Sequence, residues 1–325
     1  MTSPCFLAGL GNVLLDLVLP VTDEEFAELR LPVPKGQVLR VTADEQHAIL
    51  SQFHAERITR YPGGSCANAL RTYAWHGFPA KLLGLAGDDD AAEFLSDAFR
   101  SAGVETSGIR RLAGHVTDCC LALVTPDGER TMLPAFDAGA TAQENSFQIS
   151  DLEQVKYLHI EGYNLRFPKM LETVLEYARQ CRIRLSWDLG DVSLVQAHRD
   201  KLQALFRDNP IACLFSNHAE AREFTGFDPA EAAVALTDFV ECAVVTAGSN
   251  GAWVAQRGKS SSHIPAVHPI SFVDTIGAGD SFEGTFLAAY YSGATPVEAA
   301  RKAAAFATQV IALPGATMPE RPRRK

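Results

Sequence analysis

The chain has 325 residues, of which 47% are hydrophobic and 21% are charged, a composition typical of a soluble globular protein with a large core. Its 29 lysines and arginines against 39 aspartates and glutamates give a net charge of −10, which argues against a protein that binds duplex nucleic acid. The seven cysteines form no C-x-x-C pair, and the N-terminal apolar stretch has no basic leader. We therefore expect reduced thiols and a cytoplasmic protein with neither a nucleic-acid nor a membrane partner.

Short apolar runs alternate with helical patterns along most of the chain. This alternation predicts an α/β fold with a parallel sheet, because parallel strands are joined by crossover helices that cover both faces. The expected strands are 6–10, 81–87, 157–162, 183–188, 211–216 and 243–246, and the expected helices are 67–76, 91–102, 169–181 and 230–240.

Two strand-like excursions interrupt this alternation. The first, about 14–60, contains β-like pieces and a proline-rich stretch. The second, about 110–134, predicts a β-hairpin whose turn is Pro126-Asp-Gly128, between 121–125 and 129–132. We expect one domain over 1–325 with a small β-sheet lid built from both excursions, and a frayed basic tail at 319–325.

One glycine-rich segment, Asp274-Thr-Ile-Gly-Ala-Gly-Asp-Ser281, leads into an apolar helical face. Its glycines would expose backbone N–H groups at a helix N-terminus, where the helix dipole favours an anion. Asp280 would then lie in the first helical turn, beside that anion. Two interpretations stay open at this point: a favourable first-turn carboxylate, or a base that takes a proton from an attacking hydroxyl.

Other motifs are weaker on their own. Gly9-Leu-Gly-Asn-Val-Leu14 lacks the third glycine of a dinucleotide fingerprint, which disfavours a dehydrogenase. Pro62-Gly-Gly-Ser65 fits either a turn that caps a helix or a backbone that a ligand approaches closely. Asn217 and Glu220 are spaced so that they share one helix face, which fits a helix cap with an exposed acid.

Four motifs together carry a family resemblance. Asp274-Thr-Ile-Gly-Ala-Gly-Asp280 and Pro62-Gly-Gly-Ser-Cys-Ala-Asn68 resemble the C-terminal and N-terminal signatures of the ribokinase-like (PfkB) carbohydrate and nucleoside kinases. Asn217-His-Ala-Glu220 and Thr246-Ala-Gly-Ser-Asn-Gly251 resemble their Asn-x-x-Glu element and nucleotide turn. The motifs occur in family order. The resemblance implies a three-layer α/β/α fold with a mostly parallel central sheet and a β-sheet lid.

Within the family the chain resembles the adenosine kinase branch, through Gly11-Asn-Val-Leu-Leu-Asp16, Thr125-Pro-Asp-Gly-Glu-Arg-Thr131 and Lys35-Gly-Gln37. Three positions depart from that branch. Asn164 replaces an aromatic residue that would stack on a base, Asp118 replaces a small residue in the lid strand, and Glu283 replaces a neutral residue after the signature.

The resemblance implies an ATP-dependent phosphotransferase that uses Mg²⁺, with K⁺ as a further candidate cofactor. Asp280 would be the catalytic base, and the backbone of Gly277, Ala278 and Gly279 the anion hole. The implied acceptor-binding residues are Asn12, Asp16, Gln37, Gly63, Gly64, Asn68 and Tyr163. The implied nucleotide-binding residues are Arg130, Asn217, Thr246, Gly248 and Gly251, with Asn217 and Glu220 toward Mg²⁺ and Asp274 and Gly315 at a monovalent-cation site.

The acceptor is expected to be a primary hydroxyl of a small ribose-containing molecule, and an adenosine-like nucleoside is favoured. Two alternatives stay open: a kinase of ribose or a ketohexose, and a non-catalytic sensor of a nucleoside or sugar. Monomers and homodimers both occur among such relatives, so the oligomeric state stays open between a monomer and a homodimer.

Overall fold

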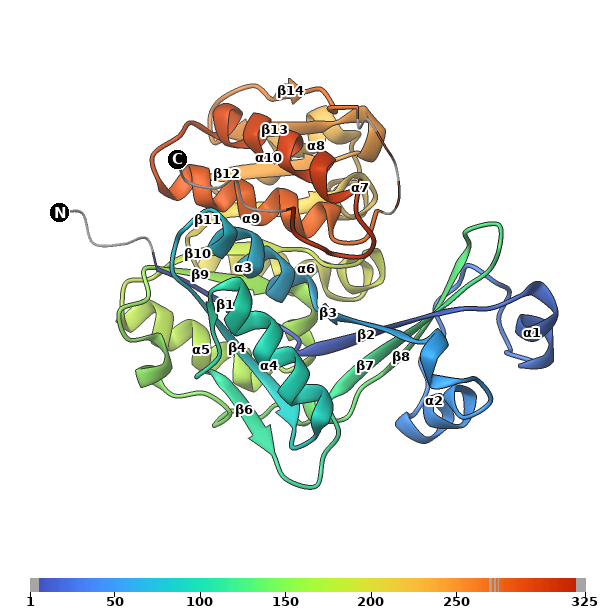
Figure 1. Cartoon of the computed structure of the whole chain (residues 1–325). Helices are drawn as coiled ribbons and strands as arrows, with labels where there is room; N and C mark the ends of the chain where they lie inside the picture. Colours follow the sequence, from blue (N-terminus) through green and yellow to red (C-terminus); the bar gives the residue numbers. More distant parts are fainter. Residues whose placement is uncertain (1–5, 269–270, 272, 274, 320–325) are drawn as a thin grey trace, which may run out of the picture.

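The centre of the protein is a large, mostly parallel β-sheet (Figure 1), seen in a computed structural model that describes residues 6–268, 271, 273 and 275–319. Its strands run in the order β14-β13-β12-β11-β10-β9-β1-β4-β5, with β6 also beside β4. At one edge of the described sheet, β13 pairs antiparallel with both β12 and β14. The strands are β1 (Leu7–Leu10), β4 (Ala80–Gly87), β5 (Val104–Glu105), β6 (Ile109–Leu112), β9 (Tyr157–Glu161), β10 (Arg184–Asp188), β11 (Ile211–Asn217), β12 (Cys242–Thr246), β13 (Ala252–Gln256) and β14 (Ser262–Ile264).

Helices cover both faces of this sheet and give a three-layer α/β/α arrangement (Figure 1). One hydrophobic cluster lies under the helices on one face, with Leu70 and Phe286 in its centre, and a second lies on the other face around Leu171 and Leu202. The first face carries α3 (Ser65–Trp75), α4 (Asp90–Ala102), α9 (Ala278–Tyr291) and α10 (Pro296–Val310), and the second carries α5 (Pro168–Gln180), α6 (Val192–Asp208), α7 (His218–Thr225) and α8 (Pro229–Leu236).

The predicted α/β fold is confirmed, and each predicted strand lies within two residues of an observed one. Continuous apolar runs locate these strands well because both of their faces are buried. The helix expected over 230–240 ends earlier, at Leu236, where a turn follows. In the described part of the chain, the helices lack the combination of length and apolarity that a membrane crossing requires.

A second, four-stranded sheet has the order β3-β2-β7-β8 and projects from the body of the protein (Figure 1). Its strands are β2 (Leu14–Pro20), β3 (Thr59–Gly63), β7 (Asp118–Val124) and β8 (Arg130–Ala135). The hairpin turn falls where it was predicted: the amide of Gly128 donates to the carbonyl of Thr125 at 2.8 Å, and Gly128 has a φ of 85°.

Two features of the excursions differ from expectation. Between β2 and β3 the chain forms α1 (Asp23–Glu28) and α2 (Ala43–Leu50), and both helices begin with a Thr-x-x-Glu capping box instead of continuing as strands. Residues 109–112 pair with β4 in the large sheet, so the second excursion reaches the small sheet only at Asp118. Of the expected frayed tail, residues 320–325 lie outside the described part.

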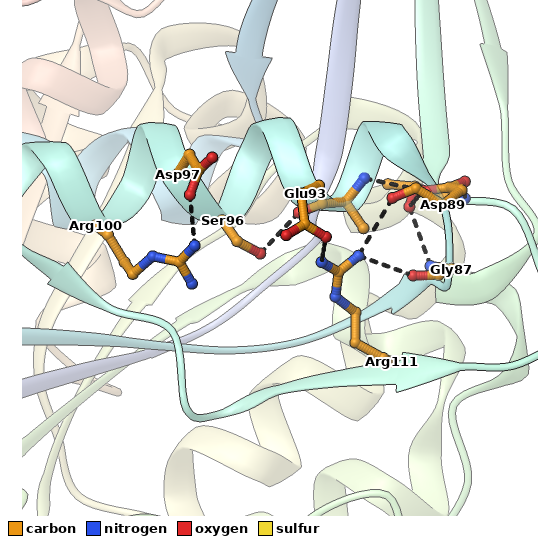
Figure 2. Close-up of polar contacts among 9 residues, drawn as sticks. Gly87, Asp89, Glu93, Ser96, Asp97, Arg100 and Arg111 are labelled. Atoms are coloured by element: carbon orange, nitrogen blue, oxygen red, sulfur yellow. Dashed lines mark hydrogen bonds and ion pairs between the residues drawn. The ribbon is translucent and has the colours of Figure 1, made fainter.

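Asp89 joins the small sheet to the body. Its carboxylate caps α4 at the amide of Ala92 (2.9 Å) and accepts from both the amide and the hydroxyl of Thr117, the residue before β7, at 2.7 and 2.6 Å. Arg111, on β6, donates to the carbonyl of Gly87 and pairs with Glu93 at 3.2 Å (Figure 2). These contacts hold the start of β7 beside the N-terminus of α4, and β6 beside the end of β4.

Candidate active site

The N-terminus of α9 is shaped by two glycines. Gly277 caps the helix with a φ of 74°, and a Cβ there would lie 2.5 Å from the Cβ of Ala316, so the position requires glycine. Gly279 faces open space, with no atom within 4 Å of a Cβ built on it. The amide of Ala278 donates to the carbonyl of Thr275 at 3.2 Å and is therefore already used in a turn. This leaves Gly279 as the most accessible part of the predicted anion hole.

Asp280 lies in the first turn of α9 and faces α3. Asn68 donates its side-chain amide to the carboxylate at 2.9 Å, and Ser65 also hydrogen-bonds to it. Arg71 holds Asn68 in turn, at 3.0 Å. Burial raises the pKa of Asp280, while the hydrogen bonds from Asn68 and Ser65 lower it. A carboxylate with a raised pKa is a stronger base for a proton on a neighbouring hydroxyl.

Asp16, on β2, comes close to Asp280 from the small sheet. Burial, and after it the negative charge of Asp280, raises the pKa of Asp16 to about 7. A Cβ on Gly63 would lie 2.4 Å from the Asp16 carboxylate, and one on Gly64 would lie 2.4 Å from the carbonyl of Asn12. The glycine pair therefore permits close packing against Asn12 and Asp16, and its approach to a ligand stays a prediction. We call Asn12, Asp16, Gly63, Gly64 and Asn68 the acceptor cluster.

Glu161 is a buried residue that the sequence did not identify. It ends β9, and its two carboxylate oxygens accept from the amide of Asn12 at 2.8 Å and from the amide of Cys66 at 3.1 Å. It thereby connects the loop after β1 with the start of α3. Burial raises its pKa, while these two hydrogen bonds lower it.

Glu283 lies one helical turn beyond Asp280 and pairs with a buried histidine. Its carboxylate is 3.3 Å from Nε2 of His159, whose Nδ1 is 3.1 Å from the hydroxyl of Ser186. Burial raises the pKa of Glu283 well above its usual range and lowers the pKa of His159 to about 4. The unusual acid after the signature thus has a polar partner within the sheet.

A cavity of about 330 Å³ opens beside the N-terminus of α9. It is lined by Thr246 at the end of β12, by Gly248 and Gly251 after it, and by Ala278 and Gly279, so five predicted site residues meet there. Most of the remaining wall is apolar, with Phe282, Val267, Ala307 and Ile311. We call it the Thr246 cavity. It adjoins the helix terminus that carries Asp280 and has the apolar walls that suit a flat aromatic ring.

Asn217 and Glu220 form a capping box at the start of α7. Both oxygens of Glu220 accept from Asn217, one from its amide at 2.9 Å and one from its side chain at 2.5 Å. Asn217 accepts from the amides of Ala219 and Glu220. Burial raises the pKa of Glu220 to about 7. Asn217 and Glu220 fit an Mg²⁺ ion held through water molecules, since both carboxylate oxygens of Glu220 already accept hydrogen bonds from Asn217.

Several predicted site residues lie elsewhere. Gln37 is exposed beside β8, where its carbonyl accepts from the amide of Met132, and Arg130 begins β8 at the far end of the hairpin from the large sheet. Neither lines the Thr246 cavity. Tyr163 donates to the carbonyl of Gly190 at 3.3 Å. Of the predicted monovalent-cation residues, Asp274 lies outside the described residues, and Gly315 has a φ of 62°.

Comparison with known proteins gives consistent results. The chain is 28% identical to the aminoimidazole riboside kinase of Salmonella typhimurium over 70% of this chain and 72% of that protein. It is 25% identical to adenosine kinase 2 of Arabidopsis thaliana over 97% and 96% of the two chains. The structure of an adenosine kinase from Sinorhizobium meliloti superposes with a TM-score of 0.84, at 26% identity, over 98% of this chain and 96% of that one.

The fold and these relatives together indicate a kinase of small sugars or nucleosides. Residues 40–323 match the pfkB family of carbohydrate kinases, and the chain belongs to that family. The resemblance expected from the sequence is confirmed.

Proposed function

We propose that the protein transfers the γ-phosphate of ATP to a primary hydroxyl of an adenosine-like ribonucleoside. The observation that carries this proposal is the position of Asp280. It lies between the acceptor cluster, through Asn68 and Asp16, and the Thr246 cavity, through Gly279. A base in that place can reach the hydroxyl of one ligand while the phosphates of another approach the helix terminus.

In this proposal Asp16 accepts hydrogen bonds from two ribose hydroxyls and so directs the primary hydroxyl toward Asp280. The Asp280 carboxylate takes the hydroxyl proton as the oxygen attacks the γ-phosphorus and the bond to the bridging oxygen of ADP breaks. The amides of the 277–279 segment stabilise the charge on the transferring group, with Gly279 the most accessible. Mg²⁺, which this family generally uses with ATP, would neutralise phosphate charge and would be oriented through water by Asn217 and Glu220.

A sugar acceptor is the second candidate, because Gln37 is exposed and does not approach Asn12 or Asp16 through any contact in the described residues. If Gln37 reads no base, the acceptor cluster alone would recognise a free sugar such as ribose or a ketohexose.

The test measures the release of ADP from ATP in the presence of Mg²⁺. The acceptors are adenosine, inosine, guanosine, cytidine, ribose and fructose. We expect turnover with purine ribonucleosides that exceeds turnover with ribose. Turnover with the free sugars alone would reject the nucleoside proposal but keep the kinase. Binding of a nucleoside without ADP release would favour the sensor alternative.

A further inference from the structure

A second cavity, of about 170 Å³, lies next to the acceptor cluster and shares Asn12 with it. Its other walls include Arg40, Asp118, Phe136 and Arg166. If the proposed function holds, the ribose lies against Asn12 and Asp16, so this cavity is where the rest of the acceptor would extend. Its polar side chains therefore bear on which acceptor the enzyme takes.

Asp118 is the most deeply buried polar residue of this cavity, with 1% of its surface exposed. It pairs with Leu14 of β2, which places it on the face of the small sheet that also carries Asp16. Its Oδ1 accepts from the amides of Asp137 and Gly139 at 2.9 and 3.0 Å. Its Oδ2 has no hydrogen-bond partner in the described structure. A buried carboxylate oxygen without a donor is destabilising, so a donor from a ligand would be favourable here.

The two arginines of the cavity carry hydrogen-bond donors, whereas Asp118 carries an acceptor. The guanidinium carbons of Arg40 and Arg166 lie 5.3 and 5.2 Å from the ring centre of Phe136, and Arg166 also lies 5.1 Å from that of Tyr163. Neither arginine has a carboxylate within ion-pair distance among the residues that the structure describes. Nε of Arg166 donates to the carbonyl of Tyr163 at 3.3 Å, which leaves its terminal N–H groups and those of Arg40 for acceptor atoms of a ligand. The aromatic rings hold the guanidinium planes in place.

We propose that, among adenosine-like purine ribonucleosides, this cavity selects those with a 6-oxo group over adenosine itself, with the arginines donating to the carbonyl oxygen and N7 and Asp118 accepting from N1–H. Arginine donors match the O6 and N7 acceptors of an oxopurine. Adenine offers an amino group in place of that carbonyl, so N–H groups would face N–H groups, and its N1 has no proton to give Asp118.

The turn that contains Gly139 covers Oδ2 of Asp118, so a ligand reaches this oxygen only after a local movement. A Cβ on Gly139 would lie 2.1 Å from Oδ2 of Asp118, and this oxygen is shut off from solvent. A ligand donor therefore meets Oδ2 once the short 3-10 helix Ala138–Thr141 shifts or the carboxyl rotates. Burial raises the pKa of Asp118 to about 6, so at pH 8 the carboxyl is ionised and accepts.

The experiment measures kcat/KM at pH 8 for inosine, guanosine, adenosine, ribose and ribose 1-phosphate. We expect inosine and guanosine to exceed adenosine by about 10-fold or more, as one well-placed arginine contact to a base implies. In Asp118→Asn, the amide can donate to N1 of adenine, so the inosine-to-adenosine ratio should fall by about 10-fold or more. A merely structural role of Asp118 would lower kcat/KM for inosine and adenosine by the same factor and leave their ratio unchanged.

Arg166→Met is a second variant, in case Asp118→Asn does not fold. It should also lower the inosine-to-adenosine ratio. Arg207→Met is its matched control, because Arg207 stacks on Phe239 at 5.2 Å outside the cavity, and the ratio should not change. An active kinase that prefers adenosine, or one that prefers ribose 1-phosphate, would overturn this inference. Turnover of free sugars alone would instead reject the proposed function.

Discussion

Asp16 combines a functional position with an unfavourable environment. Its folded-state pKa of about 7 lies above the value of about 3.9 expected in an unfolded chain. The folded protein therefore binds more protons than the unfolded chain between about pH 4 and 7, and its free energy of unfolding falls as the pH rises through that range. Burial of this carboxylate is a cost that binding an acceptor can offset.

Asp16→Asn should accordingly increase the free energy of unfolding at pH 8 by about 2 kcal/mol. This gain should shrink as the pH falls from 8 toward 4, because the folded-state carboxyl of Asp16 is then protonated and, like asparagine, uncharged. The same variant should raise the acceptor KM at least about 10-fold, because an amide cannot accept from two hydroxyls with both of its groups. Melting curves from pH 4 to 8, with acceptor kinetics, check both. A stability difference that is flat with pH would contradict the assigned pKa.

The residues of the site differ in how far the sequence could predict them. Asp280, Asn68 and Asp16 come together as expected, because each belongs to a motif with a local signal. Glu161 carries no such signal. Its partners, Asn12 and Cys66, lie 149 and 95 residues away in the chain, and only the packed sheet brings them together.

At the scale of elements, the glycine turn before α3 positions the acceptor cluster. Gly64 has a φ of 90°, and a Cβ on it would lie 2.4 Å from the carbonyl of Asn12. Gly77, just after α3, has a φ of 91° with no atom within 4 Å of the corresponding Cβ. An alanine at either position would be strained by the positive φ, but only an alanine at Gly64 would also overlap a backbone atom.

Gly77→Ala should lower the free energy of unfolding by about 1 kcal/mol through backbone strain, and Gly64→Ala should lower it by more, because its Cβ would also overlap the carbonyl of Asn12. Only Gly64→Ala should displace Asn12 and reduce kcat/KM for the acceptor, by about 10-fold or more. Thermal unfolding and acceptor kinetics of both variants measure this difference. Equal kinetics in the two variants would mean that the close approach of Gly64 to Asn12 has no functional role.

The helices and strands differ in how well the sequence pattern predicts them. Buried strands such as β4 and β9 are recognisable as continuous apolar runs. The helices α1 and α2 were missed within an excursion expected to be β-like, although Thr22 and Thr42 each precede a Glu by three residues, which is a capping-box signal. The antiparallel edge strands β13 and β14 could not be placed, because short strands depend on the partner that they pair with.

At the scale of the whole molecule, the acceptor cluster and Asp280 draw on elements of both sheets. Asp16 and Gly63 belong to the small sheet, while Asn68 and Asp280 belong to helices packed on the large one. The placement of one sheet on the other rests on tertiary contacts such as Asp89 to Thr117, which no sequence pattern encodes.

A ligand that bridges the two sheets should stabilise their relative arrangement. We expect a purine ribonucleoside at saturating concentration to slow amide hydrogen exchange in β2 and β3, while exchange in α8, on the opposite face of the large sheet, stays unchanged. Hydrogen exchange with mass spectrometry measures both regions in one sample. Protection confined to α8, or absent from β2 and β3 despite turnover, would place the acceptor elsewhere.

The role of Asp280 as the base is the central claim, and its replacement by asparagine tests it most directly. Asp280→Asn keeps the shape of the side chain but cannot take up the hydroxyl proton. We expect kcat to fall by at least about 100-fold, with the acceptor and ATP dissociation constants from calorimetry within a few-fold of the parent. A variant that binds both ligands and turns over at nearly the parental rate would contradict the assignment of Asp280 as the base.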